Sequence, residues 1–252
     1  MKISATIQAR MGSTRLPGKV MLPIDSRPLI QIQVESLRKS KYLNSIIVAM
    51  TTNKLDDKLY KFCKHKLKVN VYRGNEKDVL QRICSALKKN NVDLNVECFA
   101  DSPLIDHTLI DQFILKYKKS NYDVVTNTLK RTYPAGQEIT IYKTNKLNIL
   151  NKLVKKKDPL REHVSFNFYR FKKKFSIYNK LAPKKYHYPN LYLEVDSKKD
   201  FIFLQKIIKE LKVLNKNLNL INIIKFIKRN KKLLNINKKV ERKWKEVYKK
   251  NL

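Results

Sequence analysis

The chain has 252 residues, and 42% of them are hydrophobic, which is enough for one substantial α/β core. Its 56 Lys and Arg residues against 21 Asp and Glu give a formal net charge of +35, which would ordinarily indicate a nucleic acid or an anionic membrane as partner. Because Lys, Asn and Ile are abundant along the whole chain while Gly is scarce, we interpret the charge as drift toward AT-rich codons. We therefore expect solvated basic faces and no nucleic acid partner.

Cysteine usage and hydropathy indicate a cellular compartment. Three cysteines and four histidines share no metal-ligand spacing, and an odd number of cysteines fits a reducing environment. The N-terminus enters a strand-like segment at once, without the pattern of a signal peptide. No apolar run approaches the ~20 residues of a membrane span. The sequence predicts a cytoplasmic protein without a membrane span.

Strand-like and helix-like segments alternate through the first half of the chain. The strand candidates are Ile3–Ala9, Ser45–Met50, Lys68–Tyr72, Asn95–Ala100 and Tyr122–Thr126. The amphipathic helix candidates between them are Leu29–Lys39, Asp56–His65, Lys77–Lys89 and Thr108–Lys119. This alternation predicts an α/β fold with a mostly parallel central sheet and helices on both faces.

The alternation of strands and helices breaks after residue 130. We expect strands at Glu138–Tyr142 and Asn190–Val195, followed by basic amphipathic helices at 199–213, 219–230 and 238–249. We interpret 131–188 as a small β-rich excursion from the sheet that covers the active site or makes a dimer contact. The expected domains are 1–211, including that excursion, and a basic helical C-terminal tail at 212–252.

The loop after the first strand carries the clearest chemical signal. Arg10, Arg15 and Lys19 lie together with Gly12 and Ser13 at the end of that strand. Glycines let backbone N–H groups approach phosphate oxygens, and Arg and Lys supply charge, so the loop predicts a nucleotide polyphosphate site. It is not a Walker A motif, because five residues separate its glycines and Val20 follows Lys19. The alternative is a strand–helix turn that is basic only because the chain is.

Two carboxylates follow other strand candidates. Asp101 follows the candidate Asn95–Ala100, and Asp196 follows Asn190–Val195, which would place both at the same sheet edge as the basic loop. Such a pair could hold Mg²⁺ on nucleotide phosphates. Either residue could instead cap the following helix, although Asp106 is the better cap of its helix. We expect Asp196 to be an exposed carboxylate with little role in packing.

These motifs resemble those of a known enzyme family. The segment IQARMGSTRLPGKV resembles the signature of the sugar-acid cytidylyltransferases, whose 3-deoxy-manno-octulosonate (KDO) members carry a close ARxxSxRLPGK loop, and the chain looks most like the SpsF-type branch of spore coat polysaccharide biosynthesis. The resemblance extends through residue 201. Its further motifs are YRGNEKDVLQR (72–82), ADSPLID (100–106), PAGQEITIY (134–142), LREHVSFNFY (160–169) and EVDSKKDF (194–201).

The resemblance implies a GT-A/Rossmann-like nucleotidyltransferase fold and a defined reaction. CTP and a sugar acid would give a CMP-sugar and pyrophosphate with Mg²⁺, for surface polysaccharide or glycan biosynthesis, in an enzyme that is a homodimer. The nucleotide-binding matches are Ala9, Arg10, Gly12, Ser13, Arg15 and Lys19, and the catalytic matches are Arg10, Lys19, Asp101 and Asp196, the last two as metal ligands. The residues that would border the sugar are Arg73, Arg82, Gln137, Glu138, Arg161, Glu162 and His163.

The chain departs from the family pattern at two places, and two other functions stay open. KDO enzymes carry Gly-Asp-Glu-Pro where this chain has Ala100-Asp101-Ser102-Pro103, and SpsF-type sequences usually carry Asp at the position of Gln137. The first alternative is a GT-A glycosyltransferase using a nucleotide-sugar, whose paired carboxylates could only be Asp56 and Asp57. The second is a non-catalytic protein that binds nucleic acid or anionic surfaces through its net charge.

Overall fold

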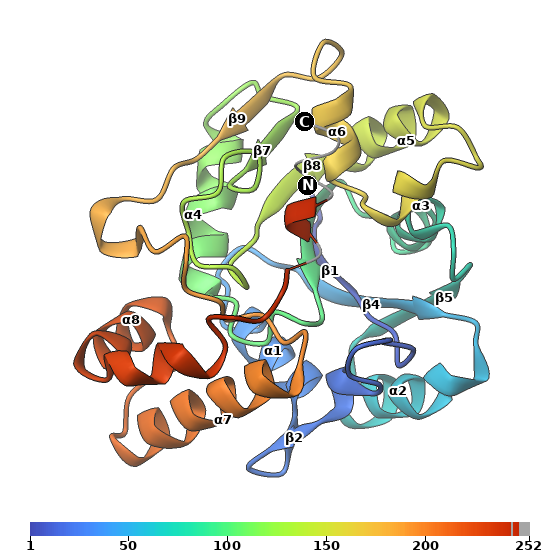
Figure 1. Ribbon diagram of the computed structural model, residues 1–252. Coiled ribbons are helices and arrows are strands. Elements are labelled where there is room, and N and C mark those ends of the chain that lie inside the picture. The colour runs from blue at the N-terminus through green and yellow to red at the C-terminus, as the bar shows by residue number, and fades with distance from the viewer. Residues whose placement is uncertain (243, 247–252) are drawn as a thin grey trace.

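The computed structural model describes residues 1–242 and 244–246, and its centre is one seven-stranded sheet (Figure 1). The strand order is β5-β4-β1-β6-β8-β7-β9, and β8 runs antiparallel to its neighbours β6 and β7 while the other pairs are parallel. The predicted α/β class with a mostly parallel sheet is confirmed. The sheet strands are β1 (Ile3–Gln8), β4 (Ser45–Thr51), β5 (Asn70–Gly74), β6 (Leu94–Phe99), β7 (Val124–Thr126), β8 (Thr140–Lys143) and β9 (Ile177–Asn179), and a separate hairpin pairs β2 (Pro23–Ile24) with β3 (Arg27–Pro28).

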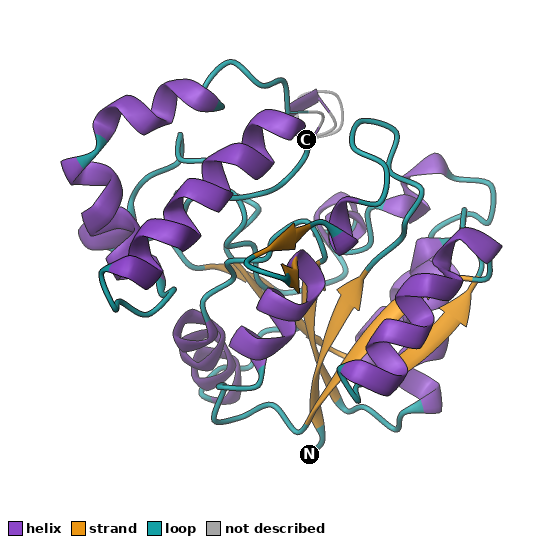
Figure 2. Ribbon diagram, turned by 90° about the horizontal axis from the view of Figure 1, so that it is seen from below, coloured by secondary structure: helices purple, strands orange, loops and turns teal. Residues whose placement is uncertain are grey.

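Helices cover both faces of the sheet (Figure 2). The α-helices are α1 (Leu29–Leu37), α2 (Asp57–Lys61), α3 (Val79–Lys89), α4 (His107–Lys118), α5 (Thr144–Leu153), α6 (Phe166–Arg170), α7 (Lys198–Val213) and α8 (Leu220–Arg229). Buried side chains of α1, α2, α4, α7 and α8 form one core cluster with the sheet, and those of α3, α5 and α6 form the other. Short 3-10 turns lie at Lys19–Met21, Lys54–Asp56, Pro159–Glu162, Lys184–Tyr186 and Lys231–Ile236, and a π-helical turn at Phe62–Lys66 extends α2.

The alternation of side chains along the central strands explains the two cores. In β4, Ile46, Val48 and Met50 enter the first cluster while Ile47 and Ala49 enter the second. A strand that is apolar on both faces belongs in the interior of a sheet covered on both sides. Because β1, β4, β5 and β6 pair in parallel, their C-terminal ends meet at one edge of the sheet.

The segment 131–188 is more closely tied to the sheet than expected, and it is richer in helix than in strand, because it contains α5 and α6 beside β8 and β9. Its strand β8 lies between β6 and β7, where Ile141 and Tyr142 point into opposite cores, and its strand β9 forms the edge of the sheet. The strand expected at 190–195 is wrong: only an isolated bridge joins Ala135 to Tyr192. Residues 191–196 are all buried, because the segment packs against the turn at 135–136, and this packing requires no strand ladder.

The C-terminal helices follow the sequence pattern in part. Helices α7 and α8 confirm the expected helices at 199–213 and 219–230. The expected helix at 238–249 is wrong over 238–242, which are not helical, and residues 243 and 247–249 of it lie outside the described part of the chain. The expected domain boundary at 211/212 lies inside α7, and the tail's Ile223 and Ile227 join the same core as the sheet. In the described residues, the helices do not combine the length and the apolar character that crossing a bilayer requires.

A buried carboxyl group lies in the middle of the sheet. Glu97 on β6 is fully buried, and the Tyr142 hydroxyl donates a hydrogen bond of 2.6 Å to its Oε2. Burial raises the pKa of Glu97 to about 7, because the charged form loses its hydration. The folded protein therefore holds a proton on Glu97 at pH values where the unfolded chain has released it.

This proton has a consequence for stability. Between about pH 4.5 and about pH 7 the folded state binds the extra proton, so the contribution of Glu97 to stability falls as the pH rises through this range and stays low above it. Glu97→Gln is neutral in both states, so we expect it to be more stable than the wild type at pH 8 by about 2–3 kcal/mol, and by little at pH 4.5. Urea denaturation at both pH values measures this. A difference that is independent of pH, or one equal to that of the exposed control Glu210→Gln, would contradict it.

Candidate active site at the C-terminal edge of the sheet

The basic loop after β1 folds back on itself through local hydrogen bonds. The N–H groups of Ser13 and Gly18 both donate to the Met11 carbonyl at 2.9 Å, and Gly18 has a φ of 68°, a left-handed conformation that favours glycine. The 3-10 turn Lys19–Met21 follows directly. The loop thus begins beside β4, where the Ala9 N–H donates to the Ala49 carbonyl at 3.1 Å, and turns Lys19 back toward the sheet edge.

Lys19 joins the two carboxylates that the sequence singled out. Its Nζ lies 3.2 Å from Oδ2 of Asp101 and 3.0 Å from Oδ1 of Asp196, and it donates to the Val195 carbonyl at 2.7 Å. Burial alone would lower the pKa of this ammonium, but Asp101 and Asp196 outweigh that effect and raise it. Residues about 80 and 180 positions apart in sequence therefore converge on one cation.

Arg15 completes the charge around Asp196. Its Nη2 lies 2.8 Å from Oδ2 of Asp196, so Lys19 and Arg15 each take one carboxylate oxygen. Burial would raise the pKa of Asp196, but the two cations outweigh it and hold that pKa below its usual range. The carboxylate is therefore ionised at neutral pH. Its side chain is only 9% exposed, so the expectation of an exposed carboxylate at 196 is wrong.

The backbone around each carboxylate is fixed by caps and by a close approach of two segments. Ser197, not Asp196, is the N-cap of α7, and Asp106, not Asp101, is the N-cap of α4, so neither candidate ligand is used as a cap. Gly136 has a φ of 91°, and a Cβ there would lie 2.7 Å from the Leu193 backbone. Because this glycine admits the segment 191–195, the Val195 N–H can donate to the Asp101 carbonyl at 2.8 Å.

The donor set around the Lys19 ammonium fits a hard divalent cation. It offers carboxylate oxygens of Asp101 and Asp196 and the carbonyl oxygen of Val195, which are the ligands that Mg²⁺ prefers. Among the described residues no group of three or more acidic, His or Cys side chains could enclose a metal. A site with two carboxylates suits a cation that keeps waters and substrate phosphates in its remaining positions.

Three of the predicted sugar-site residues, Arg82, Glu162 and His163, gather at a second corner of the site around the predicted nucleotide-binding residue Arg10. Arg10 Nη2 lies 3.0 Å from Oε1 of Glu162, which ties the loop to the turn at 159–162. Arg82 is buried, donates to the Asn75 carbonyl at 2.7 Å, and has its pKa lowered by burial and then by nearby Arg10. Burial also lowers the pKa of His163, which keeps its imidazole neutral at physiological pH.

The other predicted sugar-site residues hold the surrounding turns. Arg73 donates to the carbonyls of Thr51 and Asn53, and pairs with Asp57 at 2.6 Å. Gln137 is fully buried and bonds both the Asp106 N–H and the Leu104 carbonyl through its amide.

Two further predicted sugar-site residues, Glu138 and Arg161, are also bonded within the protein. Glu138 accepts from the Gly136 N–H at 2.8 Å and pairs with Arg131, and buried Arg161 pairs with Asp78 at 2.8 Å and donates to the Val154 carbonyl.

Of the predicted nucleotide-lining residues, Ala9 lies at the end of β1 and Gly12 and Ser13 lie in the loop, and sequence reasoning gave no role here to two buried acids, Asp56 beside the loop and Glu194 near Asp196. Ala9 is buried at the end of β1, Gly12 lies open except for the Glu76 carboxylate, and the Ser13 hydroxyl accepts from the Leu16 N–H. Asp56 accepts from the Met11 N–H at 2.7 Å and from the Thr51 N–H and hydroxyl.

The second missed acid is Glu194. Burial, followed by the neighbouring carboxylates Glu138 and Asp196, raises its pKa to about 8. The sequence offered Asp56 only as a possible glycosyltransferase carboxylate and Glu194 only as part of the motif at 194–201, because the contacts of Asp56 with Met11 and of Glu194 with Glu138 and Asp196 form only in the fold.

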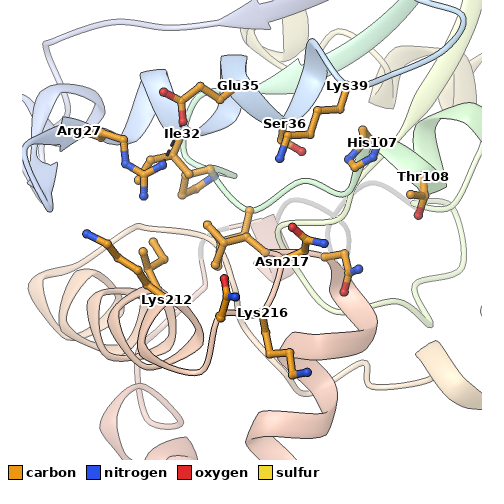
Figure 3. A pocket seen from close by; sticks show the side chains of 16 residues that line it. Arg27, Ile32, Glu35, Ser36, Lys39, His107, Thr108, Lys212, Lys216 and Asn217 are labelled. Carbon is orange, nitrogen blue, oxygen red and sulfur yellow. Dashed lines mark hydrogen bonds and ion pairs between the residues drawn. The ribbon is translucent and has the colours of Figure 1, made fainter.

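A hollow of about 490 Å³ lies elsewhere on the molecule (Figure 3). Figure 3 shows Ser36 of α1 and Lys39 just beyond that helix on one side, and Lys212 of α7 with Lys216 and Asn217 just beyond that helix on the other. The predicted site residues are not among the described residues that line it. The convergence of charged side chains at the sheet edge, rather than this hollow, therefore marks the candidate active site.

Comparison with known proteins agrees with this geometry. The profile of the cytidylyltransferase family matches residues 5–238. An uncharacterised protein of Methanocaldococcus jannaschii is 35% identical over 85% of this chain and 86% of its own, and the spore coat polysaccharide biosynthesis protein SpsF of Bacillus subtilis is 29% identical over 77% and 81%. The structure of a cytidylyltransferase from Leptospira borgpetersenii superposes with a TM-score of 0.85 at 30% identity, covering 93% of this chain and 97% of that one.

The chain belongs to the cytidylyltransferase family, with an SpsF-type relative. The resemblance stated from the loop motif is thus confirmed, as is the nucleotidyltransferase fold. The protein is an enzyme of the CTP-dependent nucleotidyltransferase type.

Asp56 provides a test of how the loop is held. Asp56→Ala leaves the N–H groups of Met11 and Thr51 without their buried acceptor, so we expect a loss of about 2–4 kcal/mol of unfolding free energy and weaker CTP binding. The neighbouring Asp57→Ala removes only a half-exposed ion pair and should cost less than about 1 kcal/mol. Urea denaturation and calorimetry with CTP measure both effects. Equal losses in the two variants would contradict the anchoring role of Asp56.

Proposed function

We propose that this enzyme transfers the cytidylyl group of CTP to a sugar acid, releasing pyrophosphate and giving a CMP-sugar for surface polysaccharide or glycan biosynthesis. The observation that carries the proposal is the convergence of Asp101 and Asp196 on one cation beside the basic loop. The similarity of that loop to the sugar-acid cytidylyltransferase signature supports a sugar acid as the acceptor. A homodimer and a cytoplasmic location are part of the same proposal.

The residues of the basic loop would have distinct roles in the transfer of the cytidylyl group. A hydroxyl of the sugar attacks the α-phosphorus of CTP in line, the bond to the β-phosphate oxygen breaks, and pyrophosphate leaves. Arg10, Arg15 and Lys19 would neutralise the charge that grows on the phosphate oxygens, and the N–H groups of the loop would position the triphosphate. Positioning and electrostatics account for most catalysis in such transfers, and no covalent enzyme intermediate is needed.

Magnesium is the proposed cofactor, and Asp101 and Asp196 would hold it. When bound, it would neutralise phosphate charge and orient the triphosphate. Its site would be the one where the Lys19 ammonium now lies, so Lys19 would turn from the carboxylates toward the phosphates when substrate enters. Both carboxylates already approach the same ammonium, which supports the proposal that they share another cation.

The corner formed by Arg10, Glu162 and His163 is the proposed sugar side of the site. Arg10 and buried Arg82 supply positive charge suited to a sugar carboxylate. The turn at 159–162 and the basic loop meet there through the ion pair between Glu162 and Arg10, whose side chains are about half exposed. A ligand at this corner could therefore contact both segments.

A glycosyltransferase is the second candidate, and the contacts of its expected metal ligands speak against it. Asp56 is buried and already accepts three hydrogen bonds, and Asp57 is paired with Arg73. Buried Asp56 is thus committed to holding the basic loop and is not exposed to a metal that would bind the diphosphate of a nucleotide-sugar, so the expected carboxylate pair is incomplete. The three cations of the basic loop also suit a triphosphate better than a diphosphate.

A pyrophosphate-release screen tests the proposed reaction. The purified protein is incubated with Mg²⁺, each of four nucleoside triphosphates and a panel of sugar acids. We expect pyrophosphate only with CTP together with a sugar acid of matching structure. Release of UDP or GDP from nucleotide-sugars would favour the glycosyltransferase. Retention of RNA at high salt without any nucleotide turnover would favour the nucleic acid-binding alternative.

Asp196 is the most direct mutational test of the carboxylate pair. Asp196→Asn keeps the side-chain shape but removes the charge, so we expect turnover to fall at least about 100-fold while the protein stays folded with about 1–3 kcal/mol less stability. The matched control is Asp25→Asn, which loses an ion pair with Lys212 away from the candidate active site. Steady-state rates and urea denaturation measure the outcome. A folded Asp196→Asn protein with normal turnover would remove this residue from the mechanism.

Lys19 gives a test of the shared cation position. Lys19→Met removes the ammonium that competes for the two carboxylates, so we expect Mn²⁺ to bind at least about tenfold more tightly without nucleotide, while turnover with CTP falls at least about 100-fold. Mn²⁺ binding is followed by electron paramagnetic resonance, with the exposed Lys206→Met as control. Unchanged Mn²⁺ affinity in Lys19→Met would contradict a common site for the ammonium and the metal.

A further inference from the structure

The C-terminal segment 237–246, which we name the C-terminal strap, reaches the candidate active site. Residue 243 of the strap lies outside the described residues. In Figure 1 the red end of the chain leaves α8 and runs back toward the centre of the molecule. The contacts place it there as well, because the Lys245 ammonium donates to the Tyr192 hydroxyl at 2.8 Å and the Trp244 indole N–H donates to Glu194 at 2.9 Å.

Arg242 is the buried centre of the strap. Its side chain is 1% exposed, its Nη2 lies 2.7 Å from Oδ1 of Asp200, and its Nη1 lies 3.5 Å from Glu194. The amide of Asn237 donates to the same Asp200 oxygen at 2.9 Å. The side chain of Asp200 is fully buried, so the strap supplies the cation that compensates its charge.

Asp200 links the strap to the backbone of Asp196, the proposed metal ligand. Its other oxygen, Oδ2, accepts from the N–H of Asp196 at 3.1 Å and from the N–H and hydroxyl of Ser197 at 2.9 and 2.8 Å. Together with the Ser197 hydroxyl it forms the capping box of α7. One carboxylate therefore bonds Arg242 on one side and the backbone of residues 196–197 on the other.

The strap also reaches Asp196 from the opposite direction. Arg15, which holds Oδ2 of Asp196, donates through Nη1 to the carbonyl oxygen of Glu241 at 3.3 Å. The main chain of Asp196 and one of its carboxylate oxygens are thus each one residue away from the strap. A buried pair such as Arg242 and Asp200 adds little net stability over an apolar pair, but breaking it leaves an uncompensated charge.

We propose that Arg242 is a positioning residue of the active site, which acts through Asp200 to fix the place of the Asp196 carboxylate, so that the C-terminal strap completes the site. The metal-binding part of this role rests on the proposed function. The geometric part does not, because it concerns only the backbone at 196–197. Displacing a catalytic group by about 1 Å can cost roughly 100-fold in rate. Loss of the contact between Arg242 and Asp200 should therefore lower turnover.

The test compares Arg242→Met with Lys245→Met in the full-length chain. Lys245 anchors the same strap to Tyr192 without touching Asp200, so it controls for loosening of the strap itself. Hydrogen exchange, measured by mass spectrometry on peptides covering 195–198, reports on the N–H groups of Asp196 and Ser197 that donate to Asp200. We expect Arg242→Met to speed this exchange about fivefold or more and to lower kcat about 10- to 100-fold with KM for CTP nearly unchanged. Lys245→Met should change neither, and Arg242→Lys should restore part of both.

The outcomes separate this proposal from the proposed function. If Arg242→Met does not fold, Arg242→Gln, which keeps a donor for Asp200 but no charge, takes its place under the same criteria. A folded neutral variant with wild-type exchange at 196–197, or an equal change in Lys245→Met, would overturn the positioning role. Absence of cytidylyl transfer by the wild type would overturn the proposed function alone, because the exchange measurement still decides the relay.

Discussion

The site depends on one electrostatic arrangement, the Lys19 ammonium held between Asp101 and Asp196. Two carboxylates this close would repel each other without a cation between them, and burial of Asp196 would make its charge costly. The cation comes from the loop after β1, one acid from the end of β6, and the other from the turn before α7. The loop, the sheet edge and the C-terminal helices therefore have to be in place together before the charges balance.

The sequence predicted the parts of this arrangement that depend on local patterns. Alternating apolar segments predicted the parallel strands β1, β4, β5 and β6, and parallel strands bring their C-terminal ends to one edge, so Lys19 and Asp101 could be expected to meet. Asp196 was expected at the same edge for a wrong reason. Its segment forms no strand, and the approach of 191–195 to Gly136 places it instead.

The remainder could not be predicted, because it consists of contacts between segments distant in sequence. The position of β8 between β6 and β7 follows from pairing over more than 40 residues, which alternation alone does not encode. Arg73 and Gln137 fall in motifs of the family, yet their polar atoms hold neighbouring turns. Arg242 lies in a stretch that the sequence predicts as a basic amphipathic helix, and its contact with buried Asp200 forms only when the strap folds back.

The central claim is that Asp101 and Asp196 share one cation position, which a divalent metal takes when the nucleotide is bound. The most direct test is a crystal structure with Mn²⁺ and a non-hydrolysable CTP analogue, in which anomalous scattering locates the metal. The account predicts an Mn²⁺ peak coordinated by oxygens of Asp101, Asp196 and the triphosphate, with Lys19 turned to the phosphates. A metal peak away from these carboxylates, or Lys19 still between them beside a bound triphosphate, would contradict it.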